Sequence, residues 1–247
     1  MKSLKRTICG VLVAASSVSL AFCREALKPD MVKIPGKNYE MMSTEVTQGL
    51  YKSIMGENPS RFKNTDSYPV ESVSWYDAIY FCNKLSEKFG LEPVYSVNGS
   101  TDVTKWGYTP QYWNNWNKIF GEIIQNTRAN GYRLPTGEEW DYATWGGQHF
   151  QYSGSSNLSK VGWYDENSED MTHPVAQKAP NGYGLYDMSG NVWEWCWDIY
   201  KDYSDGRCLR GGSWSDDSDY CRVDARGRDS AYNRSNYGGF RLARTAE

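Results

Sequence analysis

Histidine, charge of one sign and long apolar runs are all scarce in this sequence. Its 247 residues include two His, and 27 Lys and Arg against 30 Asp and Glu leave a net charge of -3. Nucleic-acid binding and polybasic membrane contacts both need concentrated positive charge, so no nucleic-acid partner is expected. Beyond the N-terminus no apolar run reaches membrane-spanning length, and the remaining chain suits one domain with its own core.

The N-terminus follows the order of an export signal. Lys2, Lys5 and Arg6 form a basic start, and residues 7–22 are almost free of charge and mostly apolar. This run is too short to remain as a membrane span. We therefore expect residues 1–22 to be a signal peptide.

The residues at the end of this run indicate lipidation. Residues 20–23 resemble a relaxed lipobox, although Phe22 is larger than the small residue usual before the cysteine. Cleavage there would leave Cys23 as a lipidated N-terminus, with residues 23–30 as a tether. We expect an exported protein, anchored to the membrane by lipid and displayed on the outer cell surface. An ordinary signal peptide with an incidental cysteine is the alternative.

Aromatic residues, helix-capping residues and turn residues predict the structure of the main domain, residues 31–247. Eleven Trp and nineteen Tyr predict a core of rings whose polar edges need hydrogen-bond partners. A capped amphipathic helix is expected to begin at Ser74, with Asp77 three positions on, and to end at Gly90, and Thr136 with Glu139 forms a capping box for a second helix. Residues 94–131 are expected to form an aromatic-rich loop, and frequent turns after Gly146 predict short strands joined by long loops.

Six cysteines leave the disulfide pattern open. Cys9 lies in the expected signal peptide and Cys23 would carry lipid. The other four can pair in three ways, or can remain as small buried thiols. They are Cys82, Cys196, Cys208 and Cys221.

Five ordered motifs extend over nearly the whole domain. They are residues 70–78 (VESVSWYDA), 132–140 (YRLPTGEEW), 181–195 (NGYGLYDMSGNVWEW), 210–214 (RGGSW) and 239–241 (GFR). In this respect the sequence resembles the formylglycine-generating-enzyme (sulfatase-modifying factor) family. The resemblance implies an α+β domain with the C-type lectin-like fold of that family, with few helices, short twisted strands and much loop. That fold carries both enzymes and binding proteins, so function depends on the site.

The resemblance also suggests that this chain is not an enzyme. Catalytic members of the family bind copper through two cysteines five positions apart, and those positions here are Asp216 and Cys221. A carboxylate is a poor ligand for Cu(I), so no copper is expected. Iron-dependent relatives use histidines of a further domain, which this chain lacks.

The same resemblance implies a structural calcium site. Its ligands would be the side chains of Asp187 and Glu194 and the carbonyl oxygens of Gly190 and Val192. Hard oxygen ligands on a tight turn suit Ca²⁺. The alternative is a loop held by its own hydrogen bonds.

Residues 215–237 have an unusual composition. Fourteen of these 23 residues are Ser, Asp, Asn or Tyr, and none is Lys, Glu, Gln, Trp or Met. The five missing types cannot arise when the adenines of an Asn codon are randomised. The segment thus resembles the variable regions of proteins diversified by an adenine-mutating retroelement, such as treponemal variable proteins.

We therefore predict a variable ligand-binding surface on a fixed scaffold. Tyr, Ser and Asn are also the residues that antibody combining sites use. The predicted framework is Cys221, Arg222, Val223, Ala225, Arg226, Ala231 and Arg234. The predicted ligand-binding residues are Ser215, Asp216, Asp217, Asp219, Tyr220, Asp224, Gly227, Arg228, Asp229, Ser230, Tyr232, Asn233, Ser235, Asn236 and Tyr237.

The leading hypothesis is a surface lipoprotein that binds a protein or another macromolecule through this segment. One alternative is an oxidoreductase of the sulfatase-modifying type. Another is a structural lipoprotein with no variable ligand. Acidic and basic residues nearly balance in the segment, so its charge does not identify the ligand.

Overall fold

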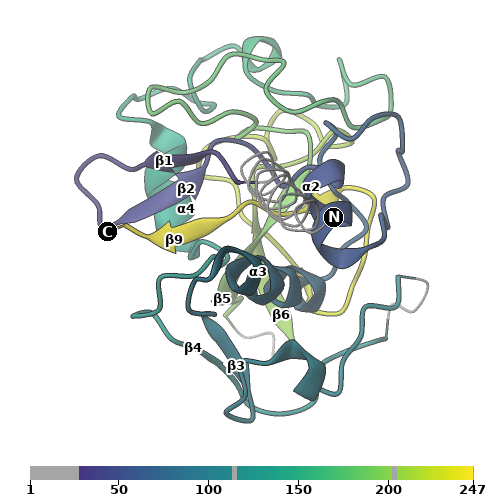
Figure 1. Cartoon of the computed structure of the whole chain (residues 1–247). Helices are drawn as coiled ribbons and strands as arrows, with labels where there is room; N and C mark the ends of the chain where they lie inside the picture. The colour runs from purple at the N-terminus through teal and green to yellow at the C-terminus, as the bar shows by residue number, and fades with distance from the viewer. Residues whose placement is uncertain (1–27, 113–115, 202–204, 247) are drawn as a thin grey trace, which may run out of the picture.

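The computed structural model describes residues 28–112, 116–201 and 205–246. The described part contains three α-helices and nine short strands connected by long loops (Figure 1). The helices are α2 (Gln48–Met55), α3 (Trp75–Phe89) and α4 (Gly137–Trp145). The strands are β1 (Met31–Lys33), β2 (Tyr39–Met42), β3 (Tyr95–Val97), β4 (Ile123–Gln125), β5 (Trp193–Ile199), β6 (Gly206–Arg210), β7 (Gly227–Ser230), β8 (Gly238–Gly239) and β9 (Ala243–Thr245). The expected α+β class is confirmed.

The strands form three small sheets. In the first, β2 lies between β1 and β9 and is antiparallel to both, which brings the end of the chain beside its first strands (Figure 1). The second is the antiparallel pair β3–β4. The third has the order β7-β6-β5-β8, with β8 parallel to β5. The central strands β5 and β6 therefore pair with β8 and β7, the two strands of this sheet that follow residue 210.

Local capping chemistry defines the helices where the sequence predicts them. The Ser74 side chain accepts a hydrogen bond from the Asp77 backbone N–H, the Asp77 carboxylate accepts one from the Ser74 backbone N–H, and Gly90 ends α3 with φ of 70°. Thr136 and Glu139 form the same reciprocal pair at the start of α4. These bonds satisfy amide groups that the first helical turn leaves without partners.

The described residues between 94 and 131 contain regular structure that the sequence did not predict. The prediction of a loop is wrong for β3 and β4, which pair across this segment, and for a 3₁₀ turn at Val103–Lys105. Each strand has only three residues, which is too short for alternation to stand out in the sequence. Beyond Gly146 the expectation of short strands and long loops is confirmed.

The core is built from aromatic rings with satisfied polar edges. The indole N–H of Trp75 donates to the Cys196 carbonyl oxygen (3.0 Å), and that of Trp195 donates to the Val73 carbonyl oxygen (2.9 Å). The Trp140 indole donates to the Glu194 carboxylate (2.8 Å). All four described cysteines are free thiols, and Cys82, Cys196 and Cys221 are fully buried.

A buried ion pair joins the last motif to β5. Arg241 and Glu194 are both fully buried, and two guanidinium nitrogens each lie 2.7 Å from a separate carboxylate oxygen. The same guanidinium also donates to the carbonyl oxygens of Met42 and Tyr186. Arg241 thus connects four separate segments of the chain.

We predict that Arg241→Ala lowers the free energy of unfolding by about 3–5 kcal/mol, because it leaves the Glu194 charge buried without its partner. Arg222→Ala is the matched control, since Arg222 pairs with Asp224 at the surface, and it should cost about 1 kcal/mol or less. Urea unfolding of the two variants measures both values. Equal losses would show that the buried pair has no special role.

Candidate ligand-binding surface

The framework of the third sheet holds both ends of residues 215–237. The segment follows β6 and contains β7, which pairs with β6 at the sheet edge, and it ends at β8. The Tyr237 carbonyl oxygen accepts from the Trp193 amide (2.7 Å), and the Gly211 carbonyl oxygen accepts from the Gly190 amide (2.8 Å). Because both ends of the segment are fixed, the residues between them can form a surface.

Buried and exposed residues alternate irregularly through the segment. Four predicted framework residues are buried, namely Cys221, Val223, Ala231 and Arg234, whereas Arg222 and Ala225 are half-buried and Arg226 is exposed. Six predicted ligand-binding residues are exposed: Ser215, Asp217, Asp219, Tyr220, Asp224 and Arg228. Eight others are half-buried: Asp216, Gly227, Asp229, Tyr232, Asn233, Ser235, Asn236 and Tyr237.

Two of the predicted ligand-binding positions are constrained by the scaffold. Ser230 is a predicted ligand-binding residue, but it is buried at the end of β7 and does not lie on the surface. A Cβ atom at Gly227 would lie 2.9 Å from the Trp193 ring, so a larger residue there would displace the ring. These positions belong to the support of the surface.

A hollow of about 350 Å³ opens between β6, β7 and the neighbouring loops. Trp193 and Leu209 of the scaffold line it together with six residues from the predicted ligand-binding set. Those six are Ser215, Asp216, Gly227, Arg228, Asp229 and Tyr237. The Tyr220 ring meets the edge of Trp193 with centroids 6.5 Å apart. The hollow thus combines an aromatic wall with acidic and basic groups.

Asp216 is part of this surface and is tied to the scaffold. One of its carboxylate oxygens accepts from the Trp193 indole (2.8 Å) and from the Ser213 hydroxyl. Burial raises the pKa of Asp216, and burial also raises the pKa of the Cys221 thiol. A thiol that stays protonated is a poor soft-metal ligand.

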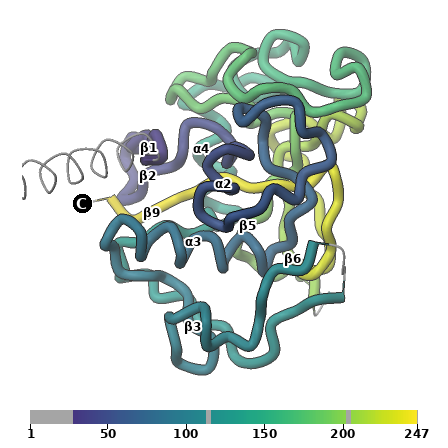
Figure 2. Tube along the Cα trace, turned by 45° about the vertical axis from the view of Figure 1, so that its right-hand side comes forward, coloured from purple at the N-terminus to yellow at the C-terminus, as the bar shows by residue number. Residues whose placement is uncertain are grey.

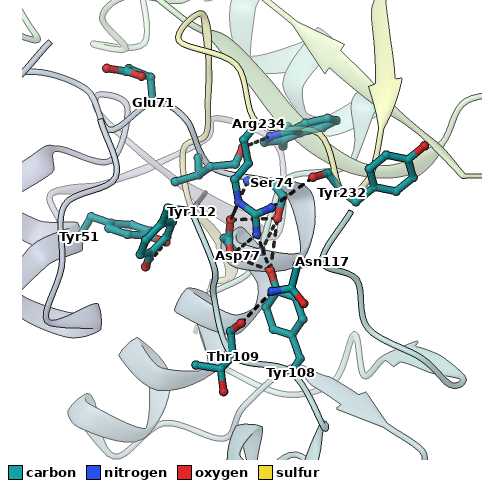
Figure 3. A network of polar contacts seen from close by, with 12 residues as sticks. Tyr51, Glu71, Ser74, Asp77, Tyr108, Thr109, Tyr112, Asn117, Tyr232 and Arg234 are labelled. Carbon is teal, nitrogen blue, oxygen red and sulfur yellow. Dashed lines mark hydrogen bonds and ion pairs between the residues drawn. The ribbon is translucent and has the colours of Figure 1, made fainter. Parts of the chain in front are cut away.

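A second buried ion pair fixes the end of the segment to α3 (Figure 3). The Arg234 guanidinium lies 2.8 Å from one oxygen of Asp77, and both side chains are almost completely buried. The Tyr108 hydroxyl donates to the other oxygen (2.6 Å), and Arg234 donates to Tyr108 (2.9 Å). Sequence analysis identified Asp77 only as a helix cap and did not single out the Tyr108 hydroxyl as a partner.

Aromatic rings also border the segment. Trp116, from the loop between η1 (Val103–Lys105) and β4, stacks on Tyr232 with ring centroids 5.3 Å apart. The Trp116 side chain is 76% exposed. The aromatic-rich residues 94–131 therefore reach the edge of the predicted surface, which their lack of periodicity did not indicate.

The proposed calcium ligands occupy a buried acidic cluster. Asp187 has φ of 56°, and one carboxylate oxygen accepts from the Ala176 amide (2.7 Å). Its other oxygen is buried, with no hydrogen-bond partner among the described residues. Burial raises the pKa of Asp187 to about 6, and burial together with the charges of Asp187 and Glu194 raises the pKa of Glu45. Sequence analysis did not find Glu45.

These residues fit a cation only in part. Asp187 has a free buried oxygen, but both oxygens of Glu194 are held by Arg241. The described residues contain no group of three or more His, Cys, Asp or Glu side chains arranged to hold a metal ion. The calcium site remains a prediction.

The N-terminal predictions lie outside the described residues. This applies to the signal peptide, to Cys23 and to most of the tether. Within the part that is described, no helix has both the length and the apolar character needed to cross a membrane.

Several known proteins are similar to this chain in sequence. Chaperone protein LppX of Paenibacillus barcinonensis is 41% identical over 194 residues, covering 69% of this chain and 67% of that protein. The formylglycine-generating enzyme of Streptomyces coelicolor is 32% identical over 180 residues, covering 60% of this chain and 56% of the enzyme. The inactive C-alpha-formylglycine-generating enzyme 2 of Mus musculus is 36% identical over 135 residues, covering 47% and 44%. The match to each of the two formylglycine-generating-enzyme relatives thus spans about half of its length.

The fold and the family are also established by comparison. Treponema denticola variable protein 1 superposes with a TM-score of 0.74 at 35% identity, covering 88% of this chain and 92% of that structure. The structure of CarF superposes with a TM-score of 0.73 at 26% identity. The model of the sulfatase-modifying factor enzyme 1-like domain matches residues 11–246. The chain therefore belongs to the formylglycine-generating-enzyme (sulfatase-modifying factor) family, which includes enzymes and inactive members.

Proposed function

We propose that this protein is an exported, lipid-anchored receptor that binds a macromolecular ligand through residues 215–237. The observation that carries the proposal is the hollow, because six of its eight lining residues belong to the set predicted from composition. A concave site with an aromatic wall and a few polar groups is typical of ligand-binding sites. No reaction is part of this function.

The separation of support from surface favours binding. The buried residues Cys221, Val223 and Arg234 hold the segment, whereas the residues Asp217, Tyr220 and Arg228 are exposed. Exposed polar residues on a rigid frame can change without loss of the fold. Such an arrangement suits a family of receptors that differ only in the surface.

Diversification by a retroelement is the further part of the proposal. It rests on the absence of five residue types from residues 215–237 and on the structural similarity to Treponema denticola variable protein 1. The N-terminal pattern, a basic start and an apolar run that ends near Cys23, supports export and lipidation at Cys23. The alternative, an oxidoreductase, draws on the catalytic relatives, but Asp216 stands at a position of their copper-binding cysteines. A structural lipoprotein is the remaining alternative.

We predict that changing Asp217, Tyr220 and Arg228 together to Ala abolishes ligand capture and leaves the melting temperature unchanged. Each exposed polar change should cost within about 0.5 kcal/mol of stability, whereas binding energy concentrates on a few aromatic and Arg side chains. Affinity capture from cell extracts, read by mass spectrometry, compares the variant with the unchanged protein.

A control triple variant carries Ala at Glu87, Lys88 and Arg128, which are also exposed but lie outside the segment. It should capture the same partners as the unchanged protein. If the surface variant also captures them, the ligand binds elsewhere. If the surface variant unfolds, the segment is part of the core.

We expect no copper-dependent oxidase activity, because only one of the two copper-binding positions carries a thiol. This is Cys221, and burial raises the pKa of its thiol. The test supplies Cu(I) and a cysteine peptide of the sulfatase type and follows conversion of the cysteine. Stoichiometric Cu(I) binding with turnover would contradict the proposal. Asp216→Cys, which restores a second thiol, is expected to gain Cu(I) affinity.

We also propose that Ca²⁺ binds at Asp187 and stabilises the fold. A cation that binds only the folded state adds about 2.7 kcal/mol at a hundred times its dissociation constant. Melting temperatures in Ca²⁺ should therefore exceed those in chelator, and the smaller Mg²⁺ is the matched control. Identical melting temperatures in Ca²⁺ and chelator would leave this loop held by hydrogen bonds alone.

A further inference from the structure

Two cysteines lie on the central strands of the third sheet. Cys196 is on β5 and Cys208 is on β6, and these strands lie side by side in both Figure 1 and Figure 2. The register pairs Trp195 with Leu209. Cys196 follows the first of these residues and Cys208 precedes the second, so the antiparallel sheet places the two cysteines across from each other.

A bulge in β5 begins at the same point. The next paired residues are Ile199 and Arg207, so three residues of β5 lie opposite Cys208 alone on β6. A bulge interrupts the regular ladder and bends the strand locally. Opposed residues on antiparallel strands have Cα atoms about 4.5–5.5 Å apart, and a disulfide needs about 4.4–6.8 Å. The strand geometry therefore allows a bond between the two sulfur atoms.

Both thiols lie on the face of the sheet that packs against α4. Cys196 is fully buried in a cluster with Trp140 of α4, and Cys208 packs against the same cluster. Side chains alternate between the two faces of a strand, and Glu194, two positions before Cys196, also contacts Trp140. Burial raises the pKa of Cys196, and a charge on Cys208 adds to this effect. The two thiols are therefore close neighbours.

The other two described cysteines have different neighbours. Cys82 lies on α3 in the main aromatic cluster, and Cys221 lies in a separate cluster with Tyr152. Both are fully buried. Among the cysteines that the structure describes, Cys196 and Cys208 are the pair that shares a cluster, so the fold favours one pairing where the sequence left three open.

An oxidant can reach this pair through Cys208, which is only half-buried. Burial raises the pKa of Cys208, and the positive charges of Arg210 and Arg226 act in the opposite direction. The Cys208 thiolate can attack a small disulfide such as glutathione disulfide, which forms a mixed disulfide and releases one glutathione thiol. Attack of the Cys196 thiolate on the Cys208 sulfur then closes the bond and releases the second glutathione.

We propose that Cys196 and Cys208 form a cross-strand disulfide that fixes β5 to β6. The two thiols lose two hydrogen atoms, which reduce the small disulfide to two thiols. The bond lies beside Arg210, on the same face of β6, whose guanidinium donates to the Ala225 carbonyl oxygen (3.2 Å). It therefore stabilises the sheet on which residues 215–237 rest. The proposed export would place the protein where such bonds persist.

Peptide mapping tests the bond. The mature protein is purified under reducing conditions, incubated with glutathione disulfide, alkylated in denaturant and digested with trypsin. Cleavage after Lys201 and Arg207 separates the two cysteines, so the bond joins the peptide of residues 179–201 to the peptide of residues 208–210. Mass spectrometry should find this linked pair, with Cys82 and Cys221 alkylated. Cys208→Ser should abolish the linked pair, and Cys82→Ala is the matched control that should keep it.

The melting temperature gives a second readout. The oxidised protein should melt roughly 5–10 °C above the reduced protein, because closing a short loop restricts the unfolded chain. Cys208→Ser should melt at the same temperature in both conditions. Separate alkylation of Cys196 and Cys208, a bond to another cysteine, or equal melting temperatures of the oxidised and reduced protein would overturn the proposal. Glutathione disulfide supplies the oxidant, so the result depends on neither export nor ligand capture, and failure here is distinguishable from failure of the proposed function.

Discussion

The buried Arg241–Glu194 ion pair is the interaction on which the rest of the structure depends. Glu194 lies on β5, which pairs with β6 on one side and β8 on the other, and the predicted ligand-binding segment, residues 215–237, connects β6 to β8 along the chain. The pair fixes the residue just after β8 against the central strand. The Arg241 guanidinium, which has no exposed surface, also donates to a carbonyl oxygen of β2 and to one in the loop at Tyr186. The segment can therefore leave and rejoin the sheet at constant positions whatever its surface residues are.

A second buried ion pair fixes the segment itself to the scaffold in the same way. Arg234 is held by Asp77 at the start of α3, and the Tyr108 hydroxyl completes the network. Burial makes the loss of either charge costly, so the segment has few ways to rearrange. The buried contacts of the segment thus stabilise the fold, whereas the exposed side chains of Tyr220, Asp217 and Arg228 can serve recognition. A receptor that varies its contacts needs this separation.

The sequence predicted contacts between residues a few positions apart, but it did not predict contacts between distant residues. Ser74 with Asp77 and Thr136 with Glu139 predicted two helix starts because a cap involves residues three positions apart. Composition predicted a ligand-binding segment, and six residues of the predicted set line the hollow. The Asp77–Arg234 pair joins residues 157 positions apart, which no local pattern encodes. Likewise, only the contact with Trp193 shows that Gly227 supports the surface.

Sequencing this gene across many isolates tests the central claim most directly. The account predicts substitutions concentrated in the codons for residues 215–237, at adenines of a matching template copy, and at exposed positions such as Asp217 and Tyr220. Codons for Cys221, Val223 and Arg234 should stay unchanged, because their side chains are buried in the support. Substitutions spread evenly along the gene, or a segment identical in every isolate, would contradict a variable receptor.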